Sequence, residues 1–190
     1  SSDVCSSDLL ATGAAGIRKS GTEDVLLIRL APGSRVAGVF TQNAFAAAPV
    51  QLCRQHLAGG HAIRALVTNA GNANCGTGQA GLDAARRSCE AVAGLLGCRA
   101  EEVLPFSTGV ILEPLPVEHI ERVLPACVAR LSAARWSEAA HAIMTTDTVA
   151  KGHSKRVSLG ERQATMTGIA KGVGMLAPNM ATMLAYLATD

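Results

Sequence analysis

The chain has 190 residues, of which 48% are hydrophobic and 17% are charged, and its formal net charge is +2. These values predict a globular chain with at least one core and exclude an intrinsically disordered protein. Aromatic residues make up only 3%, so the core is expected to consist of aliphatic side chains, and the absence of a basic block argues against nucleic-acid binding.

Cysteines and histidines are scattered along the chain. No two of the six cysteines have C-x-x-C spacing, and the five histidines are dispersed, so no metal site is expected. Reduced thiols in a cytoplasmic protein fit this spacing better than a disulfide framework does. No apolar run reaches membrane-spanning length, so the sequence predicts no contact with a membrane.

The N-terminal end differs from the rest of the chain. The segment SSDVCSSDL repeats Ser-Ser-Asp and has neither a helical nor a strand period. We therefore expect residues 1–10 to be a disordered or non-native tail. Residues 11–190 are expected to form a single domain.

The first half of the domain predicts strands followed by one clear helix. Apolar runs at Asp24–Leu30, Arg35–Phe40 and Ala62–Ala70 are typical of strands. Residues 81–97 carry apolar side chains at helical spacing, and Gly97 is a suitable C-terminal stop. Residues 101–110 (EEVLPFSTGV) predict a short strand followed by a loop.

The second half mixes helices with a hairpin. Residues 116–131 predict a helix that is broken near Pro125, and residues 137–144 a helix with Ser137 as its N-cap. Residues 156–170 predict a hairpin that turns at Gly160. Because helices intervene between only some of the strands, the pattern indicates a layered α/β or α+β fold rather than a regular parallel repeat.

Three polar loops are candidates for chemistry, and each has two interpretations. The amides and glycines of Asn69–Gly78 fit either a self-satisfied loop or a loop that faces a ligand. In STGV, the backbone N–H groups of Thr108 and Gly109 fit either an ordinary turn or donors to an oxyanion. In MTTDT (residues 144–148), the hydroxyls and a carboxylate fit either a helix cap or contacts to a polar substrate.

The C-terminal segment KGVGMLAPNMATMLAYLATD places one hydroxyl, Thr182, between a Gly/Pro-rich turn and an apolar run. The sequence shows neither a Ser–His–Asp order nor a metal site that could activate a nucleophile. A threonine that becomes the first residue of a new chain needs neither. Its α-amine, with a reference pKa of about 7.7–8.0, can accept the hydroxyl proton.

Several segments, in order, resemble the ornithine acetyltransferase family (glutamate N-acetyltransferase of arginine biosynthesis). They are VFTQNAFAAAPV, VTNAGNANCGTGQAGLDA, STGV, AIMTTDT and GIAKGVGMLAPNMATMLAYLATD. The resemblance covers nearly all of residues 11–190. It implies the layered sheet-and-helix fold that these self-cleaving enzymes share with N-terminal-nucleophile aminopeptidases.

The resemblance also implies a mechanism. The precursor would cut itself between Ala181 and Thr182, giving an alpha chain (11–181) and the start of a beta chain (182–190). Thr182 would be the nucleophile, which binds the acetyl group of N-acetylornithine and passes it to glutamate without a cofactor. Some family members also use acetyl-coenzyme A, which makes it a second candidate donor.

Further site residues and partners follow from the same resemblance. Thr108 and Gly109 would form the oxyanion hole, whereas Thr145 and Lys171 would bind substrate together with Thr182. The expected assembly is an α2β2 heterotetramer of the two chains. Because the family's second chain is long and only eight residues follow Thr182, we expect this sequence to be a fragment.

The chain departs from the family at two places. The family's STGVIG is STGVIL here, with Leu112 in place of glycine, and the amide loop has Gly76 between Cys75 and Thr77. Two other classes remain open. An N-terminal-nucleophile aminopeptidase would pass the acyl group to water, and in a non-catalytic small-molecule-binding domain Thr182 would be an ordinary strand residue.

Overall fold

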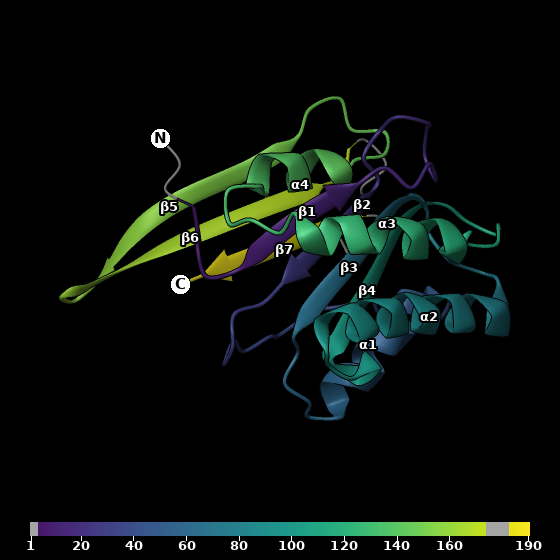
Figure 1. Ribbon diagram of the computed structural model, residues 1–190, viewed down its shortest axis with the longest axis horizontal. Helices are drawn as coiled ribbons and strands as arrows, with labels where there is room; N and C mark the ends of the chain where they lie inside the picture. Colours follow the sequence, from purple (N-terminus) through teal and green to yellow (C-terminus); the bar gives the residue numbers. More distant parts are fainter. Residues whose placement is uncertain (1–3, 174–182) are drawn as a thin grey trace.

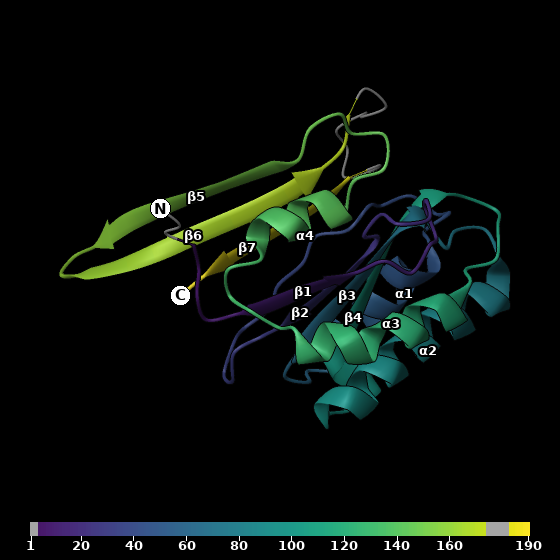
Figure 2. The same ribbon diagram turned by 45° about the horizontal axis from the view of Figure 1, so that its top comes forward.

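Figure 1 shows a computed structural model of the chain, in which residues 4–173 and 183–190 are described. Two β-sheets pack against each other, and helices cover the far face of the larger one. Figure 2 shows these layers in turn: the small sheet, the large sheet, and the helices α1, α2 and α3. The expected layered α/β fold is therefore confirmed.

The large sheet has the strand order β1-β2-β3-β4. Its strands are β1 (Leu9–Gly13), β2 (Val25–Arg29), β3 (Ala65–Asn72) and β4 (Val103–Val110). The pairs β1–β2 and β2–β3 are antiparallel, whereas β3 and β4 are parallel. A parallel pair needs a long crossover, which is supplied here by the helix α2 and a short 3-10 turn.

Three helices bury one face of the large sheet. They are α1 (Ala48–Ala58), α2 (Gly78–Leu96) and α3 (Val117–Ala129), and the 3-10 turn spans Ala100–Glu102. The buried side of α2 carries small residues such as Ala85 and Cys89, which lie against Val67 and Val103 of the sheet in one core. Small side chains let the helix lie close to the strands, so aliphatic packing fills this layer without aromatic residues.

The opposite face of the large sheet is buried by the small sheet and by one more helix. The small sheet, with the antiparallel order β5-β6-β7, consists of β5 (Lys151–Leu159), β6 (Arg162–Lys171) and β7 (Leu184–Thr189), and the helix is α4 (Trp136–Ala142). Strand β2 alternates between the two cores, since Val25 and Leu27 face the helices and Leu26 and Ile28 face the small sheet. A strand buried on both faces needs such a continuous apolar run.

A polar bridge joins the two sheets within this second core. The hydroxyl of Tyr186 in β7 lies 2.8 Å from that of Thr68 in β3, and the ring of Tyr186 meets Phe106 edge to face. Burial raises the pKa of Tyr186, while the hydrogen bond to Thr68 opposes this shift. A buried tyrosine with its hydroxyl bonded fixes the alignment of β7 on the large sheet.

Several sequence predictions are confirmed. The helix predicted over 81–97 is α2, and it ends at Gly97, whose φ of +68° favours glycine. The predicted hairpin turns at Gly160 between β5 and β6, again with a positive φ. Both features are local, and each has a turn or cap residue that enforces it.

Other local predictions are wrong. Residues 35–40 are not a strand, and the segment STGV is the end of β4 rather than a loop. Pro125 does not break α3, because it lies on the exposed side where water can satisfy the freed carbonyl. The last helix begins at Trp136, with Arg135 rather than Ser137 at its N-cap.

The expected disordered tail is corrected for residues 4–10. Leu9 and Leu10 belong to β1, and Cys5 is fully buried. The backbone of Cys5 accepts a hydrogen bond from the indole of Trp136 and donates one to the Thr167 hydroxyl. The segment lacks a period because its contacts go to distant side chains rather than to a repeated face.

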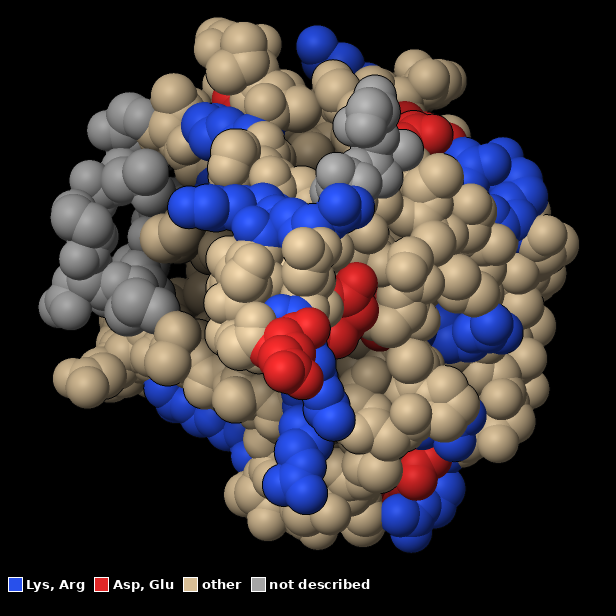
Figure 3. All heavy atoms as spheres, turned by 90° about the vertical axis from the view of Figure 1, so that its left-hand side faces the viewer, with Lys and Arg blue, Asp and Glu red and all other residues tan. Residues whose placement is uncertain are grey.

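Charges on the end of the molecule that carries the β5–β6 hairpin are mixed. Figure 3 shows lysine and arginine there in separate groups among acidic and uncharged residues. Within residues 4–173 and 183–190, no helix is long and apolar enough to span a bilayer, and no cluster of three metal-ligating side chains occurs. All six cysteines are free thiols.

Candidate active site

Three segments that are far apart in the sequence meet at one polar cluster. It joins Thr108 at the end of β4, Thr145 in the loop after α4, and Lys171 at the end of β6. The ammonium group of Lys171 donates to the Thr108 hydroxyl over 3.0 Å and to the Thr145 hydroxyl over 2.8 Å. These are three of the side chains that the sequence analysis selected, and their predicted roles stay predictions.

Lys171 is buried, with only 6% of its surface exposed. Burial lowers its pKa, and the negative charge of Asp147 opposes that shift. Within the described part of the chain, no carboxylate forms an ion pair with Lys171. Since an ammonium carries three protons and two of them go to hydroxyls, one donor remains for another group.

Asp147 anchors the backbone on both sides of the lysine cluster. One carboxylate oxygen accepts hydrogen bonds from the Gly172 N–H at 2.8 Å and from the ammonium of Lys151 at 2.5 Å. The other accepts a longer bond from the Thr145 N–H, at 3.4 Å. Burial by itself would raise the pKa of Asp147, but the bonds from Lys151, Gly172 and Thr145 outweigh it and lower the pKa to about 2.

Gly109 occupies a position that only glycine fits. Its φ is +135°, and a Cβ there would lie 2.2 Å from the carbonyl carbon of Gly71. Gly71 pairs with Gly109 across β3 and β4, and its own Cβ would lie 2.7 Å from the backbone nitrogen of Arg18. The two glycines therefore let the strand ends and the loop at Arg18 lie in direct backbone contact.

The amide loop after β3 satisfies its own backbone. The side chain of Asn74 donates to the carbonyl of Gly81, and the side chain of Asn72 accepts from the N–H of Asn74. Asn69, Asn72 and Asn74 are all buried. Their contacts favour the structural interpretation of this loop over a ligand-facing one.

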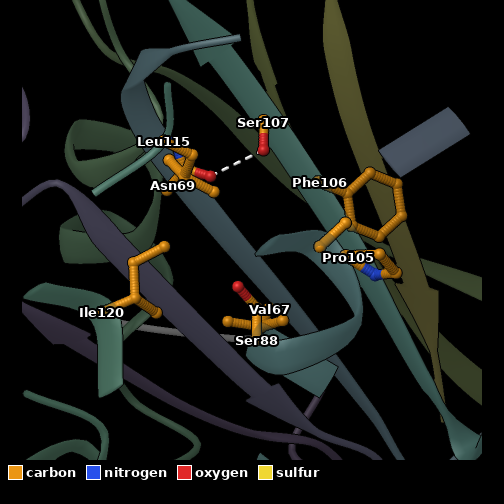
Figure 4. Close-up of a pocket in the computed structure, with 9 residues that line it drawn as sticks. Val67, Asn69, Ser88, Pro105, Phe106, Ser107, Leu115 and Ile120 are labelled. Atoms are coloured by element: carbon orange, nitrogen blue, oxygen red, sulfur yellow. Dashed lines mark hydrogen bonds between the residues drawn. The ribbon is translucent and has the colours of Figure 1, made fainter. Parts of the chain in front are cut away.

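A small cavity lies between the strands β3 and β4 and the helices α2 and α3 (Figure 4). Figure 4 shows the Ser107 hydroxyl, which bonds the amide oxygen of Asn69 at 2.6 Å, on one side of it. Its volume of about 10 Å³ has room for about one water molecule. The cavity is thus too small for an amino-acid substrate.

A wider, open hollow of about 560 Å³ lies along the small sheet. Residues of all three strands line it, among them His153 of β5, Gly168 of β6 and Leu187 of β7. Lys151 also lines this hollow, but Thr108, Thr145 and Lys171 do not. It is therefore a neighbour of the lysine cluster and not the cluster's own opening.

The sequence-selected residues thus fall into two groups. Thr108, Thr145 and Lys171 come together, with Gly109 next to Thr108, whereas Ala181 and Thr182 lie outside the described residues. The carboxylate in MTTDT, Asp147, was predicted as either a helix cap or a substrate contact, and Lys151 was not among the sequence-predicted residues. The i, i+4 spacing of Asp147 and Lys151 is the sequence signal that could have predicted their ion pair.

Comparison with known proteins identifies the family. The model of the ArgJ family matches residues 9–190. This chain belongs to the ArgJ family.

Two solved structures of family members are similar to the chain. One is the arginine biosynthesis bifunctional protein argJ from Bacillus halodurans, with a TM-score of 0.85, 30% sequence identity, and coverage of 92% of this chain and 91% of that chain. The other is the ornithine acetyltransferase from Mycobacterium tuberculosis, solved in complex with ornithine. Its TM-score is 0.79 and its identity 37%, with coverage of 96% of this chain and 93% of that chain. The expected fold is confirmed.

The departure from the family pattern at Leu112 has a structural meaning. Leu112 has a φ of +64°, in the left-handed region where glycine is favoured, and its side chain is 64% exposed. The family's glycine suits this conformation, whereas leucine is strained in it by about 1–2 kcal/mol.

Proposed function

We propose that this ArgJ family chain belongs to an acyltransferase of arginine biosynthesis, which moves an acetyl group from N-acetylornithine to glutamate through an ester on Thr182. Family membership supports the pathway and the class of reaction. The geometry around Lys171 supports the substrate class.

The observation that carries this proposal is the buried ammonium group of Lys171, which has two hydroxyl partners and, among the described residues, no carboxylate. A buried charge without a counter-ion is unfavourable by several kcal/mol. A carboxylate from a ligand would supply the missing counter-ion and accept the third proton. N-acetylornithine and glutamate both carry such a carboxylate, and the Mycobacterium tuberculosis relative was solved with ornithine.

Lys171 also fixes the direction of the hydroxyl bonds. An ammonium group can only donate, so the oxygens of Thr108 and Thr145 accept from it and their own protons stay available. A hydroxyl that donates toward a developing oxyanion lowers the barrier of acyl transfer. This supports Thr108 as an oxyanion donor beside Gly109.

Two covalent steps follow in this proposal. First, the Thr182 hydroxyl attacks the carbonyl carbon of Ala181, the peptide C–N bond breaks, and the nitrogen takes the hydroxyl proton to become the free α-amine. Water then hydrolyses the resulting ester, which releases the carboxylate of Ala181 and restores the Thr182 hydroxyl. Second, the hydroxyl attacks the acetyl carbonyl of N-acetylornithine, its proton passes through the α-amine to the leaving amino group, and ornithine departs. The amine of glutamate then attacks the acetyl ester, and the Thr182 hydroxyl regains a proton.

The same chemistry accommodates a second donor and a defined assembly. Acetyl-coenzyme A could form the same ester through its thioester carbon, and no cofactor is needed in either case. We place residues 11–181 in an alpha chain and residues 182–190 at the start of a beta chain, in an α2β2 heterotetramer. Cytoplasmic location is part of the proposal, since all six thiols are free.

The test compares three variants of the full-length precursor by mass spectrometry. Thr182→Ala should stay uncut and inactive, and Thr182→Ser should retain part of both activities because serine offers the same hydroxyl chemistry. Thr189→Ala, at an exposed threonine of β7, is the matched control and should behave as wild type. A Thr182→Ala precursor that still cleaves at this bond would contradict the proposal.

A second arm identifies the acyl acceptor. Wild-type enzyme with N-acetylornithine and no glutamate should carry one acetyl group on the peptide that begins at Thr182. Added glutamate should remove it as N-acetylglutamate. Release of free acetate at the same rate with and without glutamate would instead show the hydrolase, and an uncut, ligand-binding precursor would show the non-catalytic domain.

A further inference from the structure

One carboxylate, that of Asp147, bonds the backbone on both sides of the lysine cluster. Asp147 accepts hydrogen bonds from the backbone N–H groups of Thr145 and Gly172. Thr145 carries one of the two hydroxyls, and Gly172 directly follows Lys171. Asp147 thus fastens the loop after α4 to the end of β6. No hydrogen bond between Asp147 and the hydroxyl of Thr108 or Thr145, or the ammonium of Lys171, occurs within the described residues.

We propose that Asp147, held in place by Lys151, is a positioning residue that sets the distance between the Thr145 hydroxyl and the Lys171 ammonium. This inference rests on the proposed function and adds to it a residue that acts through others. Each of its two backbone bonds ends within one residue of a group that the cluster uses. Release of either bond lets the loop after α4 and the end of β6 move apart.

Burial makes this arrangement rigid. The side chain of Asp147 is completely buried, whereas that of Lys151 is 41% exposed, so the lysine covers the carboxylate from the solvent side. A buried carboxylate that accepts charged and backbone bonds resists movement, because each lost bond leaves it without a partner. Gly172, with a φ of +145°, supplies the backbone conformation at which its N–H reaches the carboxylate.

The carboxylate also affects the charge of the cluster. Asp147 is the negative group that opposes the burial-induced lowering of the Lys171 pKa. Asp147 accepts from the backbone N–H of Gly172 rather than from the ammonium itself, so the third proton of the ammonium stays available to a ligand. A direct ion pair would occupy that proton.

The decisive variant is Asp147→Asn in the full-length enzyme. An asparagine has the same shape but only one accepting oxygen, so it can keep the bond from Gly172 or the one from Thr145, and it loses the charge. We expect kcat per acetylatable site to fall by about 10–10², as displacement of a positioned group does. A crystal structure of the variant should show the Thr145 Oγ1 to Lys171 Nζ distance beyond hydrogen-bonding range.

Asp24→Asn is the matched control, since Asp24 is fully buried and accepts three backbone N–H bonds but none from the residues of the cluster. It should lower Tm and leave kcat per site unchanged. Unchanged kcat in Asp147→Asn, with a loss of Tm like that of the control, would overturn the proposal. If Asp147→Asn does not fold, Lys151→Met decides, with a several-fold fall of kcat in support and an unchanged kcat against.

The same experiment separates this inference from the proposed function. A wild-type precursor that transfers no acetyl group contradicts the proposed function, whatever the variants do. A wild type that transfers acetyl groups, together with an Asp147→Asn variant of equal kcat, contradicts only the positioning role. Thr189→Ala again serves as the reference for an exposed substitution.

Discussion

Two buried aspartates, Asp24 and Asp147, hold loops of this molecule in different ways. Asp24 accepts from the backbone N–H groups of Ala15, Ile17 and Arg18, at 2.6–3.0 Å, within one turn of the chain. Asp147 instead joins two segments that are 25 residues apart in sequence and also binds a lysine. The first carboxylate organises one loop, and the second aligns two elements against each other.

In the proposed reaction, this difference separates a bond that only stabilises the fold from one that positions reacting groups. Loss of the Asp24 bonds would loosen a turn whose side chains perform no chemistry in the proposed reaction. Loss of the Asp147 bonds would change the distance between groups that do. The two turns also touch, since the guanidinium of Arg18 donates to the carbonyl of Met144.

Lys171→Met should have the largest effect on activity. It removes the ammonium that bonds both hydroxyls and that, in the proposed function, is the counter-ion for a substrate carboxylate, and we expect turnover to fall by about 10²–10³. Tm should stay equal or rise, because a buried charge is replaced by an apolar side chain. Turnover and thermal melting of the full-length enzyme measure the two effects. Lys155→Met, at an exposed lysine of β5, is the control. A folded Lys171→Met enzyme with normal turnover would refute the role of Lys171 in the reaction.

Asp24→Asn should give the opposite result. The amide cannot accept as many N–H bonds as the carboxylate does, and each buried donor left without a partner costs roughly 1–3 kcal/mol. We therefore expect a loss of about 2–4 kcal/mol in the free energy of unfolding, with turnover retained. Denaturant unfolding measures it; a fall in turnover equal to that of Asp147→Asn would mean that the two turns act as one.

The pH dependence of stability should separate Asp147 from its asparagine variant. The pKa of Asp147 is lowered from 3.8 to about 2 in the folded protein, so the carboxylate stabilises the fold above pH 3.8. This contribution is lost as the pH falls through about 2. The difference in Tm between wild type and Asp147→Asn should be constant from pH 6 to about pH 5 and shrink below about pH 4; a constant difference down to pH 2 would argue against the lowered pKa.

The smallest effect is expected at Leu112, which neither Asp24 nor Asp147 contacts through a hydrogen bond among the described residues. Leu112→Gly should stabilise the chain by up to about 1 kcal/mol, because the left-handed conformation suits glycine and the added chain entropy of the unfolded state offsets part of the gain. Thermal melting measures this change. Gly97→Ala, at another left-handed position with open space around it, should show a loss of similar size.

The sequence could predict the elements that are defined locally. The apolar period of α2, its glycine stop and the hairpin at Gly160 all depend on residues within one element. The unbroken helix at Pro125 and the packed segment at Cys5 could not be predicted, because both depend on which side faces the rest of the fold. The apolar period of a segment does not show which of its sides packs against distant parts of the chain.

The site was accessible only through the family pattern. Thr108, Thr145 and Lys171 lie on three elements, and no spacing along the chain brings them together. The sequence pattern offered Asp147 as a helix cap or a substrate contact, but not as a link to β6, because its partner there is the backbone N–H of Gly172, a group that nearly any residue could offer. A helix cap was the natural local interpretation of a carboxylate just after a helix.

The hydrogen bond between Tyr186 and Thr68 has a consequence for a chain that is cut before Thr182. Tyr186 lies four residues after Thr182, within β7, which pairs with β6 from Leu184 to Thr189. Cleavage would therefore give two polypeptides that stay bound to each other. The second one would begin two residues before β7, a strand that is paired with β6 of the first. The pieces should co-purify through gel filtration and part only in denaturant, as two chains that share one fold.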